Sequence, residues 1–153
     1  MSQEILLDIL NKNGVDSELI FFKESVKDSK SSATASKLDL SKIVKTVLFI
    51  DKAGGVCSAI IRSTERVSKS KVREALNTSK LELIKFEDVI SHVGFPAGGV
   101  PPFGYSASFV IDSDLGDDEV VLVGGGTIYS LLRIKIKDIK KLSSPVVFDI
   151  KQE

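Results

Sequence analysis

The chain has 153 residues, the length of one domain, and its hydrophobic fraction of 42% and charged fraction of 27% are typical of a soluble globular protein. A net charge of zero argues against a protein that holds nucleic acid mainly by its phosphates, although brief contact with one RNA end is compatible with it. A single cysteine excludes an internal disulfide, and with one histidine it argues against a Cys/His metal site. Without a signal peptide or an apolar run of about 18 residues, the sequence predicts a cytoplasmic protein that does not enter a membrane.

Taken in order, the apolar patterns predict an α+β domain over residues 1–153. Helices are expected over 2–13, about 33–38, from 68 or 70 to 76, 87–93 and 137–142. Strands are expected over 18–24, 43–51, 56–62, 81–84, 107–112, 119–123, 129–136 and 146–150. The polar run 29–36 has the composition of a linker, and only its alanine spacing suggests a short helix. Because short turns join the strands and helices fall unevenly between them, we expect a mixed and curved sheet.

The strand at 43–51 contains the most informative charge, Lys45. Alternation would place Lys45 with Val47 and Phe49 on one face, and Thr46 on the other; both faces are otherwise apolar, so the strand should be covered on both sides. An ammonium group there requires water, a carboxylate or a ligand. Lys45 therefore either lines a cavity and meets an anionic or carbonyl group, or extends its charged end to the surface.

Two glycine-rich segments could bind a ligand through their backbones. The Gly/Pro loop, residues 97–104, combines glycines with Pro101 and Pro102, and a rigid loop of this kind can present free amides to an anion or a carbonyl. The glycine run, Gly124–Gly126, follows a strand and could do the same, although it lacks the spacing of a nucleotide-binding motif. Each could equally be a tight connection. With no Ser-His-Asp arrangement or nucleophile elbow in the sequence, an enzyme of this kind would act by positioning and backbone electrostatics.

A local run of basic residues extends from the end of the strand at 56–62 into the helix that follows it. Its members are Arg62, Arg66, Lys69, Lys71 and Arg73. The run is either a solvated face or a contact for RNA phosphates.

Four patterns, in this order, resemble the YbaK family, the free-standing relatives of the editing domain inserted in bacterial prolyl-tRNA synthetases. They are Ala33-Thr34-Ala35, the IVKTVL sequence of 43–48, the GGVPPFG sequence of 98–104 and the VLVGGG sequence of 121–126. The resemblance extends from about Val15 to Ile150. It implies an α+β, YbaK-like fold with a mixed, curved, barrel-like β-sheet and flanking helices.

The resemblance also implies an activity, hydrolysis of the ester that joins a wrong amino acid to the 3′ end of a tRNA. The expected substrate is a small amino acid such as alanine or cysteine on the tRNA for proline. The expected partners are the aminoacyl-tRNA 3′ end and an aminoacyl-tRNA synthetase, with the protein itself a monomer and no cofactor or metal required. The family often has a basic residue and a further glycine after its late glycines, where this chain has Thr127-Ile128-Tyr129.

The site residues follow from the matched motifs. The expected catalytic residues are Lys45, Gly98, Gly99, Val100 and Pro102. The expected substrate contacts are Phe22, Thr46, Pro101, Phe103, Gly104, Gly124, Gly125 and Gly126. In this mechanism Lys45 binds the terminal phosphate or ribose, and the loop amides polarise the ester carbonyl. It requires Lys45 and those amides to face one cavity.

Two other functions remain open on the sequence. One is a non-catalytic module with the same fold that binds a tRNA end, a synthetase or a small amino-acid-like ligand. The other is a hydrolase of a different small ester or nucleotide. A non-catalytic module would bind tRNA or a synthetase without hydrolysing aminoacyl-tRNA. A different hydrolase would act on small esters or nucleotides, and tRNA would not inhibit that activity.

Overall fold

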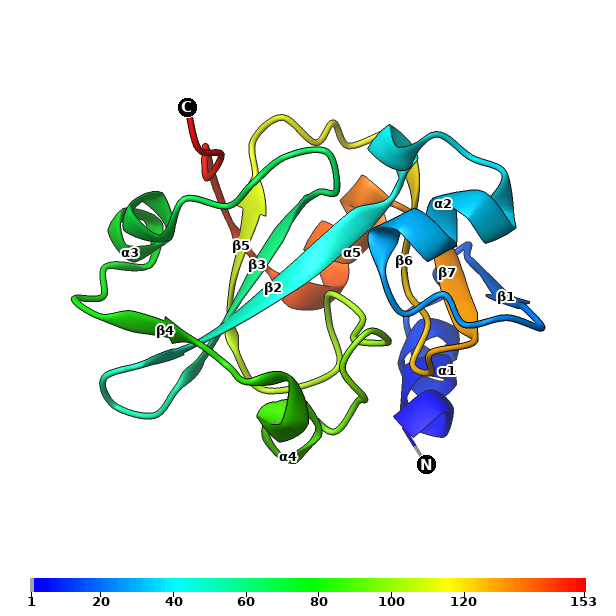
Figure 1. Ribbon diagram of the computed structural model, residues 1–153, viewed down its shortest axis with the longest axis horizontal. Helices are drawn as coiled ribbons and strands as arrows, with labels where there is room; N and C mark the ends of the chain where they lie inside the picture. The colour runs from blue at the N-terminus through cyan, green and yellow to red at the C-terminus, as the bar shows by residue number, and fades with distance from the viewer. Residues whose placement is uncertain (1) are drawn as a thin grey trace.

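The computed structural model describes residues 2–153, and their helices and strands alternate along the chain (Figure 1). The helices are α1 (Ser2–Lys12), α2 (Ser29–Ser36), α3 (Lys69–Leu76), α4 (Val89–Val93) and α5 (Ile136–Ser143), with short 3-10 helices η1 (Leu40–Lys42) and η2 (Phe86–Asp88). The strands are β1 (Glu18–Phe21), β2 (Val44–Asp51), β3 (Val56–Arg62), β4 (Leu81–Leu83), β5 (Ser108–Asp112), β6 (Val120–Gly124), β7 (Ser130–Lys135) and β8 (Val146–Phe148). The predicted strands are recovered with ends shifted by a few residues.

The strands form two sheets that meet along β2 and β6. One has the order β1-β7-β6 and is antiparallel, and the other has the order β4-β2-β3-β5-β8 and is mixed. A single parallel bridge between Ile43 and Leu122 joins them. The α+β class with flanking helices is therefore confirmed; the sheets are curved around one another, and residues 2–153 form no closed barrel.

The β2–β3 hairpin organises the larger sheet, as its apolar sequence predicts. Its tight turn is fixed by Asp51, whose carboxylate accepts the amide hydrogens of Ala53 at 2.9 Å and Gly55 at 2.8 Å. Val44 and Leu48 pack into one core cluster, while Phe49 packs into another on the opposite face. The strand is thus covered on both sides.

The helices cover the outer faces of the sheets. In Figure 1, α3 lies at the far left against β5, and α1 lies beside the three-stranded sheet. The buried Ile136 and Ile139 of α5 join the larger core cluster. Over residues 2–153, none of the helices combines the length and the apolar character that a membrane span needs.

Helix α2 begins earlier than the alanine spacing predicts. Asp28 caps it: the carboxylate accepts the Ser31 amide hydrogen at 2.7 Å, and the Ser31 hydroxyl accepts from the Asp28 amide at 3.3 Å. This capping box outweighs the linker-like composition, because it satisfies backbone donors that a short helix would otherwise leave free. The helix ends at Lys37, which adopts a left-handed φ of 59°.

Arg62 connects the two sheets at the end of β3. Its guanidinium donates to both oxygens of Glu119, at 2.7 and 3.0 Å, and to the carbonyl of Ser41 at 2.9 Å. Glu119 directly precedes β6, and Ser41 lies in η1 just before β2. Arg62 therefore belongs to an ion pair inside the fold and is not a free phosphate contact. The hydrogen bonds from Arg62 lower the pKa of the Glu119 carboxyl below its ordinary value.

We expect Glu119→Gln to destabilise the protein at neutral pH by about 2 kcal/mol, since it removes a charge-assisted, two-point contact. A carboxyl whose folded-state pKa is lowered stabilises the fold above its unfolded pKa and loses that effect as pH falls through the folded pKa. The difference between wild type and variant should therefore be constant from pH 8 to about pH 5 and should narrow below about pH 4.3.

Urea unfolding at several pH values measures this difference. Glu82→Gln is the matched control, because Glu82 pairs with Lys80 on the surface with both side chains 65% exposed. Equal losses for Glu119→Gln and Glu82→Gln at pH 7 would contradict a structural role for the Arg62 contact.

Candidate functional site

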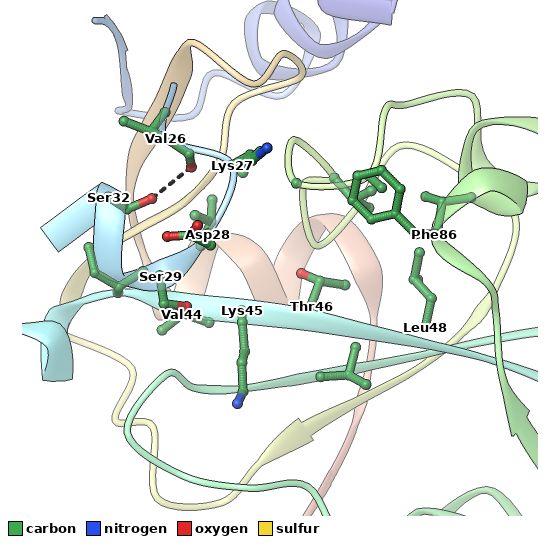
Figure 2. Close-up of a pocket in the computed structure, with 18 of the residues that line it drawn as sticks. Val26, Lys27, Asp28, Ser29, Ser32, Val44, Lys45, Thr46, Leu48 and Phe86 are labelled. Carbon is green, nitrogen blue, oxygen red and sulfur yellow. Dashed lines mark hydrogen bonds between the residues drawn. The ribbon is translucent and has the colours of Figure 1, made fainter. Parts of the chain in front are cut away.

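A cavity of about 370 Å³ lies where the two sheets meet (Figure 2). Its walls come from segment 26–32, strand β2, the stretch 83–89 from the end of β4 to the start of α4, loop residues 97, 98 and 100, and the facing ends of β6 and β7. The volume lies in the range of small-molecule sites. Because β4 pairs with β2 only at residues 49–51, the edge of β2 before that point is left open to the cavity.

The Gly/Pro loop and the glycine run pack backbone against backbone along one wall. A Cβ atom on Gly124 would lie 2.2 Å from the carbonyl oxygen of Val100, and one on Gly99 would lie 2.7 Å from that of Thr127. The Gly126 amide also donates to the Gly99 carbonyl at 2.8 Å. Glycine is required here because no side chain fits between the two chains.

Segment 26–28 closes the adjoining wall. Gly98 has a φ of +86°, and a Cβ atom there would lie 2.7 Å from both the Cβ and the carbonyl oxygen of Lys27. The Val26 amide donates to the Ile128 carbonyl at 2.7 Å, and the Ser32 hydroxyl donates to the Val26 carbonyl at 2.9 Å, as the dashed line in Figure 2 shows. These bonds hold the segment before α2 against the connection between β6 and β7 and against α2 itself.

The loop amides are used in two different ways. The Gly99 amide donates to the Pro96 carbonyl at 2.9 Å and so closes a turn. By contrast, the amides of Gly98 and Val100 donate to no residue within 2–153, and both residues line the cavity. Two unpaired donors on either side of a fixed turn can bind a carbonyl oxygen that gains negative charge.

Thr46 and Lys45 lie on opposite faces of β2. Figure 2 shows Thr46 on the side of Lys27 and Asp28, while the Lys45 side chain points the other way. The Thr46 hydroxyl oxygen is buried and has no hydrogen-bond partner in the described part of the chain. A buried hydroxyl of this kind costs about 1–3 kcal/mol unless another group satisfies it, so it marks a place where a ligand can bind.

Lys45 is half-buried beside the turn that follows β3. Burial lowers the pKa of its ammonium, the charge of Arg66 lowers it further, and Glu65 raises it in part. The backbone of Lys45 belongs to the cavity-lining strand, but its charged end lies on the face turned away from the cavity floor. The ammonium and the loop amides therefore do not face one cavity, although the predicted mechanism requires that they do. Asp28 contributes the one carboxylate among the lining residues, and the Ser31 amide lowers its pKa.

The aminoacyl-tRNA editing domain family matches the chain over residues 23–142, which include every wall of this cavity. The chain belongs to this family.

Within it, the chain is similar to parts of much longer enzymes and to whole solved proteins. It is 33% identical over 85 residues to the proline–tRNA ligase of Thermotoga neapolitana, covering 56% of this chain and 15% of the ligase. It is 22% identical over 103 residues to the proline–tRNA ligase of Pelobacter propionicus, covering 65% of this chain and 18% of that ligase. The chain thus spans less than a fifth of the ligases it matches.

Two crystal structures share the fold over nearly their entire length. A hypothetical protein, APE2540, is 25% identical with a TM-score of 0.88, and 97% of this chain and 99% of that one are covered. A candidate trans-editing enzyme for prolyl tRNA synthetase is also 25% identical, with a TM-score of 0.87 and coverage of 99% and 98%. These similarities agree with the fold expected from the YbaK resemblance.

The editing-domain cavity includes some of the predicted site residues and not others. The lining members are Lys45, Thr46, Gly98, Val100 and Gly124. Gly99, Pro101, Pro102, Phe103, Gly125 and Gly126 are buried behind the wall, Gly104 packs against Phe95, and Phe22 packs beside a separate core cluster. The roles given to these residues remain predictions.

Sequence reasoning missed most of the residues that line the cavity, and two of them differ in the signal that the sequence offered. Asp28 carried a usable signal, because its capping box with Ser31 places it at the start of a helix. Phe86 carried none, because nothing in the local pattern shows that η2 lies at the mouth of the cavity.

We expect Gly124→Ala to destabilise the domain by about 2 kcal/mol, because its Cβ would overlap the Val100 carbonyl and force the backbones apart. Gly116→Ala is the matched control, since the nearest atom to its Cβ would be 4.0 Å away, and it should shift stability by less than about 0.5 kcal/mol. Urea unfolding midpoints measure both. If the two variants unfold at the same midpoint, the backbone contact does not constrain the wall.

Proposed function

We propose that this editing domain is a trans-acting deacylase that hydrolyses the ester bond of mischarged aminoacyl-tRNA. The observation that carries the proposal is the pair of unpaired amides, those of Gly98 and Val100, on the wall of a cavity that also contains the Thr46 hydroxyl. Membership of the editing-domain family and the likeness to a candidate trans-editing enzyme support the same reaction.

The chemistry suits a site without an activated side-chain nucleophile. Water attacks the ester carbonyl carbon, and the carbonyl oxygen becomes an oxyanion that accepts from the amides of Gly98 and Val100. The carbon–oxygen bond to the ribose then breaks, and the ribose oxygen takes the proton that the attacking water loses, leaving a free amino acid and a ribose hydroxyl. We assign orientation of the water to the neighbouring ribose hydroxyl of the substrate. Loss of one oxyanion donor costs about 2.7–4 kcal/mol in enzymes that use such donors.

Lys45 is assigned to the tRNA and not to the carbonyl. Its ammonium points away from the floor formed by Thr46, so the assignment rests on the family resemblance and requires the tRNA phosphate to approach from the opposite face of β2. Partial burial supports this role, because the ammonium forms no salt bridge within the described residues and the charge of Glu65 offsets its burial only in part, so an incoming phosphate is favoured.

The proposed substrate is a small amino acid, such as alanine or cysteine, on the tRNA for proline. The two ligases that match the chain are proline–tRNA ligases, and the solved neighbour is described as acting for prolyl tRNA synthetase. A synthetase distinguishes side chains that differ by one methylene by only about 1–3 kcal/mol, so a second hydrolytic site is useful there. We place this reaction in the cytoplasm, with a synthetase as the natural source of the substrate.

The deciding experiment measures loss of label from alanyl- and cysteinyl-tRNA for proline, with prolyl-tRNA as the correctly charged control. Wild type should hydrolyse at least one mischarged species. Lys45→Ala should lower kcat/KM by about tenfold or more through the lost phosphate contact. Lys52→Ala, in the exposed turn after β2, should leave it unchanged.

Each result has a distinct meaning. Hydrolysis that is equal in wild type and Lys45→Ala removes Lys45 from the mechanism. Binding of tRNA without any turnover would instead show a non-catalytic recognition module. Activity on small esters or nucleotides that tRNA does not inhibit would show a different hydrolase.

Thr46→Val separates a binding role from a structural one. Because the hydroxyl lacks a partner within the described chain, we expect the free energy of unfolding to stay constant or to rise by about 1 kcal/mol. Deacylation should nevertheless fall by about tenfold in kcat/KM, as the hydroxyl no longer reaches the substrate. Thr78→Val, outside the cavity, should not change the rate. A variant that loses stability and keeps full activity would contradict the assignment.

A further inference from the structure

Three apolar side chains stand exposed beside the mouth of the cavity. Leu83, Phe86 and Ile90 are 61%, 69% and 56% exposed, and they follow one another on β4, η2 and α4. We call them the apolar rim. Single exposed hydrophobic residues are ordinary, but Leu83 and Phe86 also line the cavity, so this group continues the site onto the surface.

Backbone hydrogen bonds fix the segment that carries the apolar rim. The Ile84 amide donates to the Leu48 carbonyl at 3.0 Å, and the Asp88 amide donates to the Lys85 carbonyl at 2.9 Å. Val89, the residue between Phe86 and Ile90 that turns inward, is only 7% exposed. The Phe86 ring is therefore presented to the cavity side, as Figure 2 shows, from a fixed position.

The position of the ester restricts what can reach this rim. If the carbonyl binds the amides of Gly98 and Val100, the ribose must leave through the mouth and carry its base with it. The chain has zero net charge, so phosphate contacts alone give it little hold on an RNA end. An aromatic ring can bind an RNA end without relying on charge, because every base has a face that stacks on such a ring.

We infer that the apolar rim, with Phe86 at its centre, binds the base of the substrate's terminal nucleoside by stacking. This inference rests on the proposed deacylase function and adds a substrate-binding residue to it. Leu83 precedes and Ile90 follows Phe86 along the chain, and their exposed side chains add apolar surface for the base.

The chain contains no tryptophan, which makes a direct binding assay available. Phe86→Trp introduces a single indole at the rim, and stacking of a purine quenches indole fluorescence. The probes are AMP and ribose 5-phosphate, which share the sugar phosphate and differ by the base. Phe21→Trp is the matched control, because Phe21 is 64% exposed on β1 and does not line the cavity.

We expect AMP to quench Phe86→Trp in a saturable way, while ribose 5-phosphate does not, and neither to affect Phe21→Trp. Absence of AMP quenching, or equal responses to both probes, overturns the inference. Emission of ligand-free Phe86→Trp that changes with protein concentration also overturns it, since a second copy of the chain would then cover the rim.

Kinetics provide the second arm. For mischarged tRNA, Phe86→Ala should raise KM about tenfold with a smaller change in kcat. Phe86→Trp, which keeps an aromatic ring, should have a KM close to that of wild type. Phe21→Ala should behave as wild type; equal KM values for Phe86→Ala and Phe21→Ala overturn the inference. If wild type hydrolyses no aminoacyl-tRNA, the proposed function fails, and the fluorescence arm still decides whether the rim binds a base.

Discussion

Two stretches of backbone lie in direct contact beside the cavity, and the shape of the site depends on that contact. The Gly/Pro loop and the glycine run approach so closely that a methyl group on Gly124 would overlap the carbonyl of Val100. The hydrogen bond from the Gly126 amide to Gly99 fixes their relative position. A loop held in this way loses little freedom when a substrate binds, which is what preorganised donors require. The glycines are thus needed for the position of the wall, and only some of their amides remain for a ligand.

The cavity also depends on an incomplete sheet. Strand β2 is paired with β3 along its length but with β4 only near its end, and one bridge, from Ile43 to Leu122, joins it to the smaller sheet. A fully paired strand would offer no edge to a ligand. Arg62 compensates for the sparse pairing, because its contacts with Glu119 and Ser41 hold together the segments that lead into β6 and β2. The stability of this ion pair and the shape of the cavity are therefore linked.

The sequence predicts the elements of this fold well and the roles of individual groups less well. Nearly continuous apolar runs, rich in β-branched residues, identify β2 and β3, since strands covered on both faces have this pattern. The two glycine segments could be singled out for the same local reason. That the Gly99 amide is consumed by Pro96 while the Gly98 amide is free follows from turn geometry, which the residue types do not reveal. The position of Phe86 at the cavity mouth depends on contacts between distant segments, so no local pattern reports it.

The division of the cavity into backbone and side-chain walls bears on how an editing domain can change its substrate. The wall that presents amides packs through Gly98, Gly99 and Gly124, which tolerate no side chain, so these positions cannot be altered without displacing the donors. The remaining lining includes Val26, Val44 and Leu131, whose side chains are almost fully buried. A change of one methylene at such a position alters the space for an amino acid and leaves the amides in place. In the proposed mechanism, selectivity and carbonyl binding would therefore lie on separate walls, and the first could vary while the second stays fixed.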